Sequence, residues 1–223
     1  MIAIRQGCEA LWQSIGAIPN GKQPMPSIYD LKPRFQRVLR PLSQTLAGFG
    51  VTPNAITLLA MLGSCGVGTL VLRATQQPVW LLLVPAWLLL RMALNAIDGM
   101  MAREFQLTTP LGAVLNELGD VVSDLMLYLP FAFLSPPAQW PVVGFTMGAI
   151  LTEFCGVLAG MLTGSRRYEG PMGKSDRALL VGLLALLTFA VPRAITLWPW
   201  VFGIAALLAA VTCWQRLAKV LRA

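Results

Sequence analysis

Long apolar runs, separated by short breaks that contain proline or charged residues, fill most of the chain. Each run is close to the roughly 20 residues that cross the core of a bilayer. The six runs cover residues 55–73, 79–100, 112–134, 141–163, 178–195 and 197–215. This pattern predicts an all-α membrane protein with six transmembrane helices.

Residues 28–47 carry a different pattern, with apolar positions at three- and four-residue spacing. The apolar stripe consists of Ile28, Leu31, Phe35, Val38, Leu42 and Leu46. Basic residues lie largely away from this stripe, at Lys32, Arg34, Arg37 and Arg40. Because the next segment enters the membrane, we interpret 28–47 as an amphipathic interfacial helix with its basic groups toward lipid phosphates. A helix packed on a soluble neighbour is the alternative.

The two ends of the chain complete the domain prediction. Residues 1–27 contain several prolines and glycines and lack the pattern of a signal peptide, so we expect a loosely ordered cytoplasmic segment. Residues 48–223 form the predicted transmembrane domain. Fourteen Lys and Arg residues fall on one side of the predicted topology and two, Arg73 and Arg193, on the other. This asymmetry predicts that both termini are cytoplasmic.

Composition narrows the classes of function. Charged residues make up only 12% of the chain, against roughly a quarter in soluble domains. The net charge of +7 indicates contact with an anionic lipid membrane, and no pattern of aromatic and basic residues favours nucleic acid. The chain has no histidine, which excludes Ser-His-Asp catalysis and HExxH zinc sites. Acid–base or metal chemistry must therefore use carboxylates.

Polar residues gather in the second, third and fourth predicted spans. They are Arg91, Asn95, Asp98, Asn116, Glu117, Asp120, Asp124 and Glu153. Ionisable groups at membrane depth are costly and usually mark a functional site. The residues of spans two and three each follow one helix face. A rise of about 1.5 Å per residue predicts that Asn116 lies near Asp98 and Asp120 near Asn95.

The same depth ladder places Asp124 level with Arg91, and we expect these two residues to form a structural ion pair. Oxygen ligands from Asp and Asn suit Mg²⁺, Mn²⁺ or Ca²⁺. Gly99 and Gly112 lack side chains beside the cluster, which leaves room for a phosphate group. Tight helix packing is the alternative reason for a glycine at either position.

The motif that joins spans two and three is specific. Residues 95–120 read NAIDGMMAREFQLTTPLGAVLNELGD, which resembles the CDP-alcohol phosphotransferase signature DxxDGxxARx8GxxxDxxxD over its full length. The segment TPNAIT at residues 52–57 is similar to the TPNxxT motif of that family. The resemblance implies a bacterial inner-membrane enzyme, present as a homodimer, that functions in phospholipid synthesis. It implies transfer of a phosphoalcohol group from a CDP-linked donor, CDP-diacylglycerol in the first instance, to an alcohol, with release of CMP.

The resemblance also implies residue roles. A divalent metal, Mg²⁺ or Mn²⁺, is expected at Asn95, Asp98, Asn116 and Asp120. Asp120 is the implied base that deprotonates the acceptor hydroxyl. Donor contacts are implied for Pro53, Asn54, Thr57, Gly99, Ala102, Arg103 and Gly112.

The chain departs from the signature at two positions, where Asn95 and Asn116 replace the first and third aspartates. Each change keeps a carbonyl ligand and removes a negative charge, which weakens the binding of two divalent ions. One ion, an ion bound mainly with the donor's pyrophosphate, or a changed reaction remain open. A non-catalytic relative that binds nucleotide or lipid, and an ion-coupled transporter, are the alternative functions.

The predicted inner loop between spans four and five is basic. Its cations are Arg166, Arg167, Lys174 and Arg177. They predict an anion pocket for a donor or acceptor phosphate. The alternative is the ordinary excess of positive charge in cytoplasmic loops. Ser175 or Asp176 is positioned to cap span five.

Overall fold

The computed structural model describes residues 28–164 and 166–222. All of the elements within those ranges are helical, which confirms the predicted all-α class. The expectation of a loosely ordered cytoplasmic segment concerns residues 1–27, which lie outside the described residues. Helix α2 spans Ile28–Gly48. Its residues to Phe35 group with the preceding segment, and residues 36–223 form one compact unit, to which the following account refers.

The helices follow one another with short connections. After α2 the order is α3 (Pro53–Val71), η1 (Leu72–Thr75), η2 (Pro78–Leu82), α4 (Leu83–Glu104), α5 (Pro110–Tyr128), α6 (Phe131–Leu134), η3 (Pro136–Ala138), α7 (Gln139–Thr163), α8 (Lys174–Ala190), η4 (Pro192–Leu197) and α9 (Trp198–Val220).

Four helical segments are long and apolar enough to cross a membrane. They are Pro53–Thr75, Pro78–Glu104, Pro136–Thr163 and Pro192–Val220. The other two predicted spans do not meet both conditions. Helix α5 carries three carboxylates, and α8 is short, with 17 residues. The chain is therefore a multi-pass membrane protein.

Two predicted spans differ from the observed helices at their ends by one to two helical turns. The span predicted at 178–195 is α8, which begins at Lys174 and ends at Ala190. Asp176 caps this start, because its Oδ2 accepts a hydrogen bond of 2.9 Å from the backbone N–H of Gly173. The span predicted at 112–134 is interrupted after Tyr128, at Leu129 and Pro130, before the short α6.

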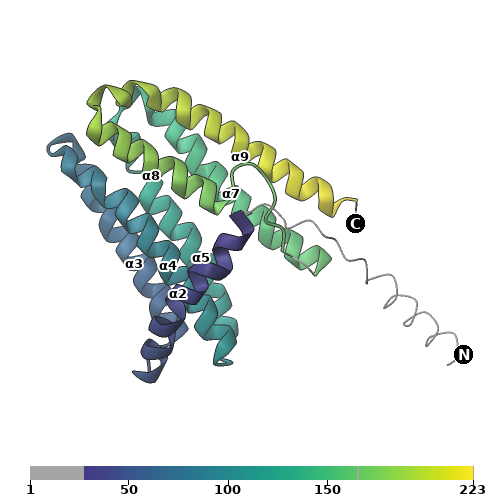
Figure 1. Cartoon of the computed structure of the whole chain (residues 1–223). Coiled ribbons are helices and arrows are strands. Elements are labelled where there is room, and N and C mark those ends of the chain that lie inside the picture. Colours follow the sequence, from purple (N-terminus) through teal and green to yellow (C-terminus); the bar gives the residue numbers. More distant parts are fainter. Residues whose placement is uncertain (1–27, 165, 223) are drawn as a thin grey trace, which may run out of the picture. The chain divides into compact units, whose positions relative to one another are not determined.

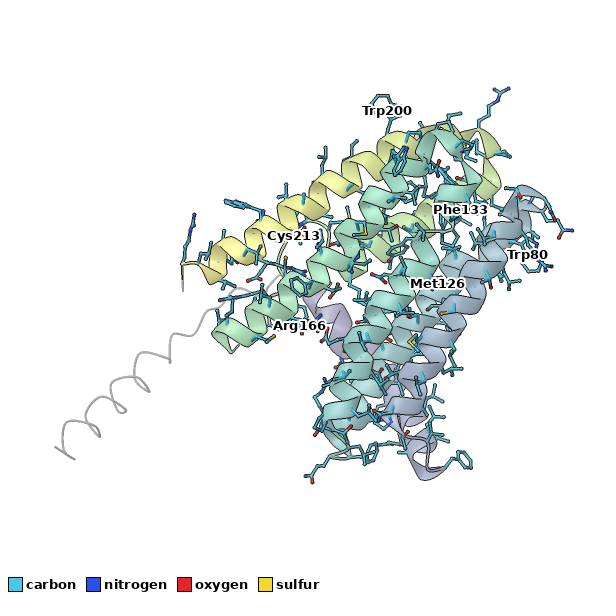
Figure 2. All side chains as sticks on the ribbon, turned by 180° about the vertical axis from the view of Figure 1, so that it is seen from behind. Trp80, Met126, Phe133, Arg166, Trp200 and Cys213 are labelled. Atoms are coloured by element: carbon cyan, nitrogen blue, oxygen red, sulfur yellow. The ribbon has the colours of Figure 1, made fainter. Side chains whose placement is uncertain are left out.

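The helices form two neighbouring groups within the main unit (Figure 1). Helix α3 packs on both α4 and α5, and α7 runs along α9; α4 meets α8 and α5 meets α7. A fully buried aromatic cluster joins α5, α6, α7 and α9, through Tyr128, Phe131, Phe145, Trp198 and Phe202. Figure 2 shows Trp80, Phe133 and Trp200 at one end of the molecule, away from Arg166. The larger apolar core includes this aromatic cluster, and a second buried cluster, of Ile56, Ile97, Met100 and Met101, lies beside Asp98.

Gly68 sets the distance between α3 and α5. A Cβ at this position would collide with the backbone carbonyl of Met126, which cannot rotate away. We expect Gly68→Ala to destabilise the protein by about 1–3 kcal/mol, the usual cost of overpacking. Gly66→Ala is the matched control, since its Cβ would meet no atom within 4 Å. Thermal melting in detergent measures both, and equal melting temperatures for the two variants would contradict the proposed close contact.

Candidate active site

The candidate site begins where α3 and α5 start. Both helices open with a Thr-Pro pair: the side chain of Thr52 accepts a hydrogen bond from the Ala55 N–H, and that of Thr109 accepts one from the Gly112 N–H. These caps fix the first turns of the two helices. The Cβ of an alanine at Gly112 would lie only 2.8 Å from Asn54 Oδ1. Glycine at this position therefore permits α3 and α5 to approach at the TPN segment.

Asp98 on α4 is buried and faces α3. Its side chain accepts a hydrogen bond of 2.8 Å from the hydroxyl of Thr57, which lies one turn into α3. Thr57 also donates to the carbonyl of Pro53, so its hydroxyl is shared between two acceptors. The contact connects the two motifs found in the sequence and gives Thr57 a position beside a carboxylate, which sequence reasoning did not foresee.

Asp120 on α5 is contacted by three side chains. Asn95 Nδ2 donates to Asp120 Oδ1 at 3.3 Å, at the depth that the helical rise predicts. Arg91 Nη2 lies 3.2 Å from the same oxygen, and the ammonium group of Lys174 also contacts it. Two cations from different helices therefore neutralise the carboxylate proposed as the base.

Arg91 and Asp124 begin a chain of buried ion pairs. Arg91 Nη1 lies 2.6 Å from Asp124 Oδ1, and both side chains are less than 5% exposed. Asp124 Oδ2 lies 2.9 Å from Arg177 on α8, which also contacts Glu153 on α7 at 2.6 Å. Alternating charges thus brace α4, α5, α7 and α8 at one depth.

The chain of ion pairs ends at the loop between α7 and α8. Glu153 also contacts Arg166 Nη2 at 2.8 Å, and Arg166 Nη1 contacts Glu117 on α5. The Nε atoms of Arg166 and Arg167 are buried and have no hydrogen-bond partner among the described residues. Arg177 is fully buried and its Nε atom also lacks a partner there, although its Nη2 atom pairs with Asp124 and Glu153.

Arg216 on α9 fixes the same loop from the other side. Its guanidinium donates to the carbonyl oxygens of Glu169, Tyr168 and Thr152. At the loop surface, Lys219 Nζ lies 3.0 Å from Glu169 Oε1. A hydrogen bond from its own backbone, together with Lys219, lowers the pKa of the Glu169 carboxyl. From the sequence, Arg216 was counted only among the cytoplasmic cations, because no feature of its own segment predicts contacts with the backbone carbonyls of a distant loop.

The remaining motif residues lie near the C-terminal end of α4 and the N-terminal end of α5. Arg103 is exposed. A Cβ at position 99 would lie 3.5 Å from the Arg103 guanidinium, which is an ordinary van der Waals contact. Ala102 and Asn116 are half-buried. The position of Arg103 alone therefore does not require glycine at 99.

The oxygen ligands suit a single divalent ion. Among the residues that the structure describes, no group of three or more His, Cys, Asp and Glu side chains is placed to hold a metal. Asp98 offers a carboxylate without an ion-pair partner in the described part of the chain, and Asn95 and Asn116 offer amide oxygens. Mg²⁺ is commonly held by one or two carboxylates together with substrate phosphates. The residues fit one such ion shared with a diphosphate, and they do not fit a cage of four carboxylates.

Comparison with known proteins places these residues in a family. The family model described as CDP-alcohol phosphatidyltransferase matches residues 50–214. The chain is 46% identical over 195 residues to the inner membrane protein YnbA of Escherichia coli, covering 87% of this chain and 96% of that protein. It is also 36% identical over 104 residues to an uncharacterized protein of Aquifex aeolicus, covering 47% of this chain and 49% of that one.

Solved structures share the fold. The phosphatidylinositol phosphate synthase of Mycobacterium tuberculosis with CDP-DAG bound superposes with a TM-score of 0.70 at 22% identity, covering 82% of this chain and 94% of that chain. The same synthase in complex with manganese and citrate gives a TM-score of 0.69 at 22% identity, covering 81% and 87%. At this level of identity the likeness concerns the arrangement of helices.

Proposed function

The chain belongs to the CDP-alcohol phosphatidyltransferase family, and we propose that it transfers a phosphatidyl group from CDP-diacylglycerol to an alcohol acceptor, releasing CMP, in bacterial phospholipid synthesis. The observation that carries the proposal is the meeting of Thr57, Asp98, Asn95 and Asp120 at one place. Thr57 belongs to the first motif, and the other three belong to the second. A bound CDP-DAG in a structural neighbour supports a CDP-linked lipid donor.

The proposed membrane arrangement has six crossings with both termini in the cytoplasm, in the bacterial inner membrane. Helices α5 and α8 are the two crossings added to the four apolar segments. Their charges can lie within the membrane because they pair with one another inside the bundle. Val38 in α2 and Phe49 directly after it, which are 76% and 81% exposed, support an interfacial position for the second half of α2. We further propose a homodimer, as is expected from the family resemblance.

In the proposed reaction, the acceptor hydroxyl attacks the phosphorus that carries diacylglycerol. Asp120 accepts the proton of that hydroxyl, a new P–O bond forms to the acceptor, and the bond between the two phosphates breaks. CMP leaves with the electron pair of that bond. Thr57, through its hydrogen bond, and the backbone of α4 hold the Asp98 carboxylate beside the donor.

The donor is proposed to bind over the inner ends of α3, α4 and α5. Its contacts there are Pro53, Asn54, Thr57, Gly99, Ala102, Arg103 and Gly112. The capped first turns of α3 and α5 offer backbone N–H groups to phosphate oxygens. On the acceptor side, the partly exposed side chains of Arg166 and Arg167 are proposed to contact a phosphate or polyol, with Lys174 at the edge of this pocket. Arg177 stands behind this pocket and fixes it.

A divalent ion, Mg²⁺ or Mn²⁺, is proposed at Asp98, with Asn95, Asn116 and Asp120 around it. When bound, the ion supplies positive charge to the diphosphate of the donor. Manganese in a structural neighbour supports this choice of cofactor class.

Metal and donor binding should depend on each other. Because the amide oxygens of Asn95 and Asn116 bring no charge, the free site should bind Mg²⁺ weakly, and the donor's diphosphate should supply the missing negative charge. Linkage requires the same factor in both directions. We expect a CDP-linked ligand to tighten Mg²⁺ at least about 5-fold, within the usual range of coupling energies, when both are titrated calorimetrically.

The control is the double variant Asn95→Asp/Asn116→Asp, which should bind Mg²⁺ more tightly without donor and show a smaller effect of the donor. Tight binding of two ions by the parent, unchanged by the CDP-linked ligand, would refute the coupling.

One cellular experiment tests the proposed function as a whole. Mass spectrometry of lipids from cells with and without the protein should reveal a phospholipid that depends on it and on Asp98. An unchanged lipid profile under expression of the intact protein would favour a non-catalytic relative that binds nucleotide or lipid.

A further inference from the structure

Two residues of α8 pair in register with two residues of α5. Lys174 and Arg177 lie three positions apart on α8, and Asp120 and Asp124 lie four positions apart on α5. The structure joins Lys174 to Asp120 and Arg177 to Asp124. Arg177 is fully buried and its ion pair with Asp124 joins α8 to α5, and Lys174 lies on the same face of α8 one turn earlier. The contact at Asp120 therefore follows from the matched spacing of the two ion pairs on the two helices.

Nothing in α8 itself favours a lysine at this position. Lys174 is the first residue of the helix, where the macrodipole carries partial positive charge and disfavours a cation. Its side chain is 35% exposed, whereas that of Asp120 is 11% exposed. The buried carboxylate is the partner that stabilises the lysine there.

The charges around the site nearly cancel before any ion binds. The carboxylates of the network are Glu117, Asp120, Asp124, Glu153 and, beside them, Asp98; the cations are Arg91, Arg166, Lys174 and Arg177. Five negative and four positive groups among these described residues leave one net negative charge. Aspartates at positions 95 and 116 would raise this to three net negative charges. A chain with two asparagines and a lysine on Asp120 thus has little charge with which to attract a second divalent ion.

We propose that Lys174, together with Arg91, provides at Asp120 the positive charge that a second divalent ion would bring, so that this chain binds one ion, at Asp98, jointly with the donor's diphosphate. The inference rests on the proposed function, because the CDP-linked donor supplies that diphosphate. Lys174 is a positioning residue here: it holds the Asp120 carboxylate in place for the acceptor hydroxyl and itself makes no contact with a metal.

Counting bound Mn²⁺ by electron paramagnetic resonance tests this without any turnover. Purified protein is titrated with Mn²⁺ in the absence and presence of CDP, which carries the diphosphate. The parent should bind one ion per chain. Lys174→Gln should bind Mn²⁺ without CDP at least about tenfold more tightly, because a cation that competes for Asp120 is gone. Without CDP, the parent should bind Mn²⁺ most weakly, Lys174→Gln more tightly, and Asn95→Asp/Asn116→Asp most tightly.

Two control variants separate charge from structure. Lys174→Arg keeps the cation and should behave as the parent. Lys219→Gln removes a cation that pairs with Glu169, away from Asp120, and should also behave as the parent. Lys174→Met serves as a second neutral variant if the glutamine protein is poorly folded.

Two results would overturn the inference. One is two Mn²⁺ ions bound by the parent. The other is an affinity for Mn²⁺ in both neutral variants equal to that of Lys219→Gln. Failure of CMP release with the expected order of Mn²⁺ affinities would instead reject the transfer reaction alone, so the two failures are distinguishable.

Discussion

Replacing either retained signature aspartate, by Asp98→Asn or Asp120→Asn, should lower CMP release from CDP-diacylglycerol by about 10²–10⁴-fold, the range of a lost acid–base group. Asp120 is the proposed base, and asparagine cannot accept the hydroxyl proton. Asp98 is the carboxylate without an ion-pair partner, and Asp98→Asn removes the remaining charge with which the site attracts a divalent ion. Both changes are close in volume, so the helices should still pack.

The matched control is Glu104→Gln on the same helix as Asp98. Glu104 pairs with the exposed Arg40 and lies outside the site, so its loss should change CMP release by less than a few-fold. The rate of CMP release is measured in detergent or nanodiscs for protein shown to be folded by thermal melting. Rates of both aspartate variants within a few-fold of the parent would remove these residues from the mechanism.

Arg91→Met should cost about 3–5 kcal/mol of stability, because it leaves the buried Asp124 with one cation fewer and removes a partner of Asp120. The side chain of Arg91 is 4% exposed, so water cannot take the place of the lost cation beside Asp124. The expected readout is a large drop in melting temperature in detergent.

The double variant Arg91→Met/Asp124→Leu provides the comparison. It removes both charges, and Arg177 keeps its contact with Glu153. The double variant should therefore recover part of the stability lost by Arg91→Met. Equal melting temperatures for the single and double variants would show that the pair contributes little to stability.

The parts of the site that sequence predicted depend on local geometry. Asn95 meets Asp120, and Arg91 meets Asp124, because α4 and α5 are rigid helices joined by a short connection, so their depths follow from the rise per residue. The same reasoning predicted the helical class and the position of most helices. Helix boundaries were predicted less accurately where a cap decides them, as at the start of α8, where Asp176 accepts a hydrogen bond from the Gly173 N–H.

The parts that sequence did not predict depend on how distant helices pack. Lys174 follows Asp120 by 54 positions, and nothing in its own segment indicates which carboxylate it meets. Glu153 stood out as a charge within an apolar run, but its partners Arg166 and Arg177 lie on the following loop and on α8, and only the tertiary structure brings their side chains to it. The anion pocket of the loop cations stays a prediction. In the structure Arg166, Arg167 and Arg177 each pair with a carboxylate, and each also has a buried Nε atom without a partner among the described residues.

The measurement that bears most directly on the account is CMP release from CDP-diacylglycerol by the purified protein in nanodiscs, with Mg²⁺ and a mixture of alcohol acceptors. The account predicts that CMP and a new phospholipid appear in equal amounts, and that both require the metal, Asp98 and Asp120. Folded protein that binds the donor and forms neither product with any acceptor would contradict it.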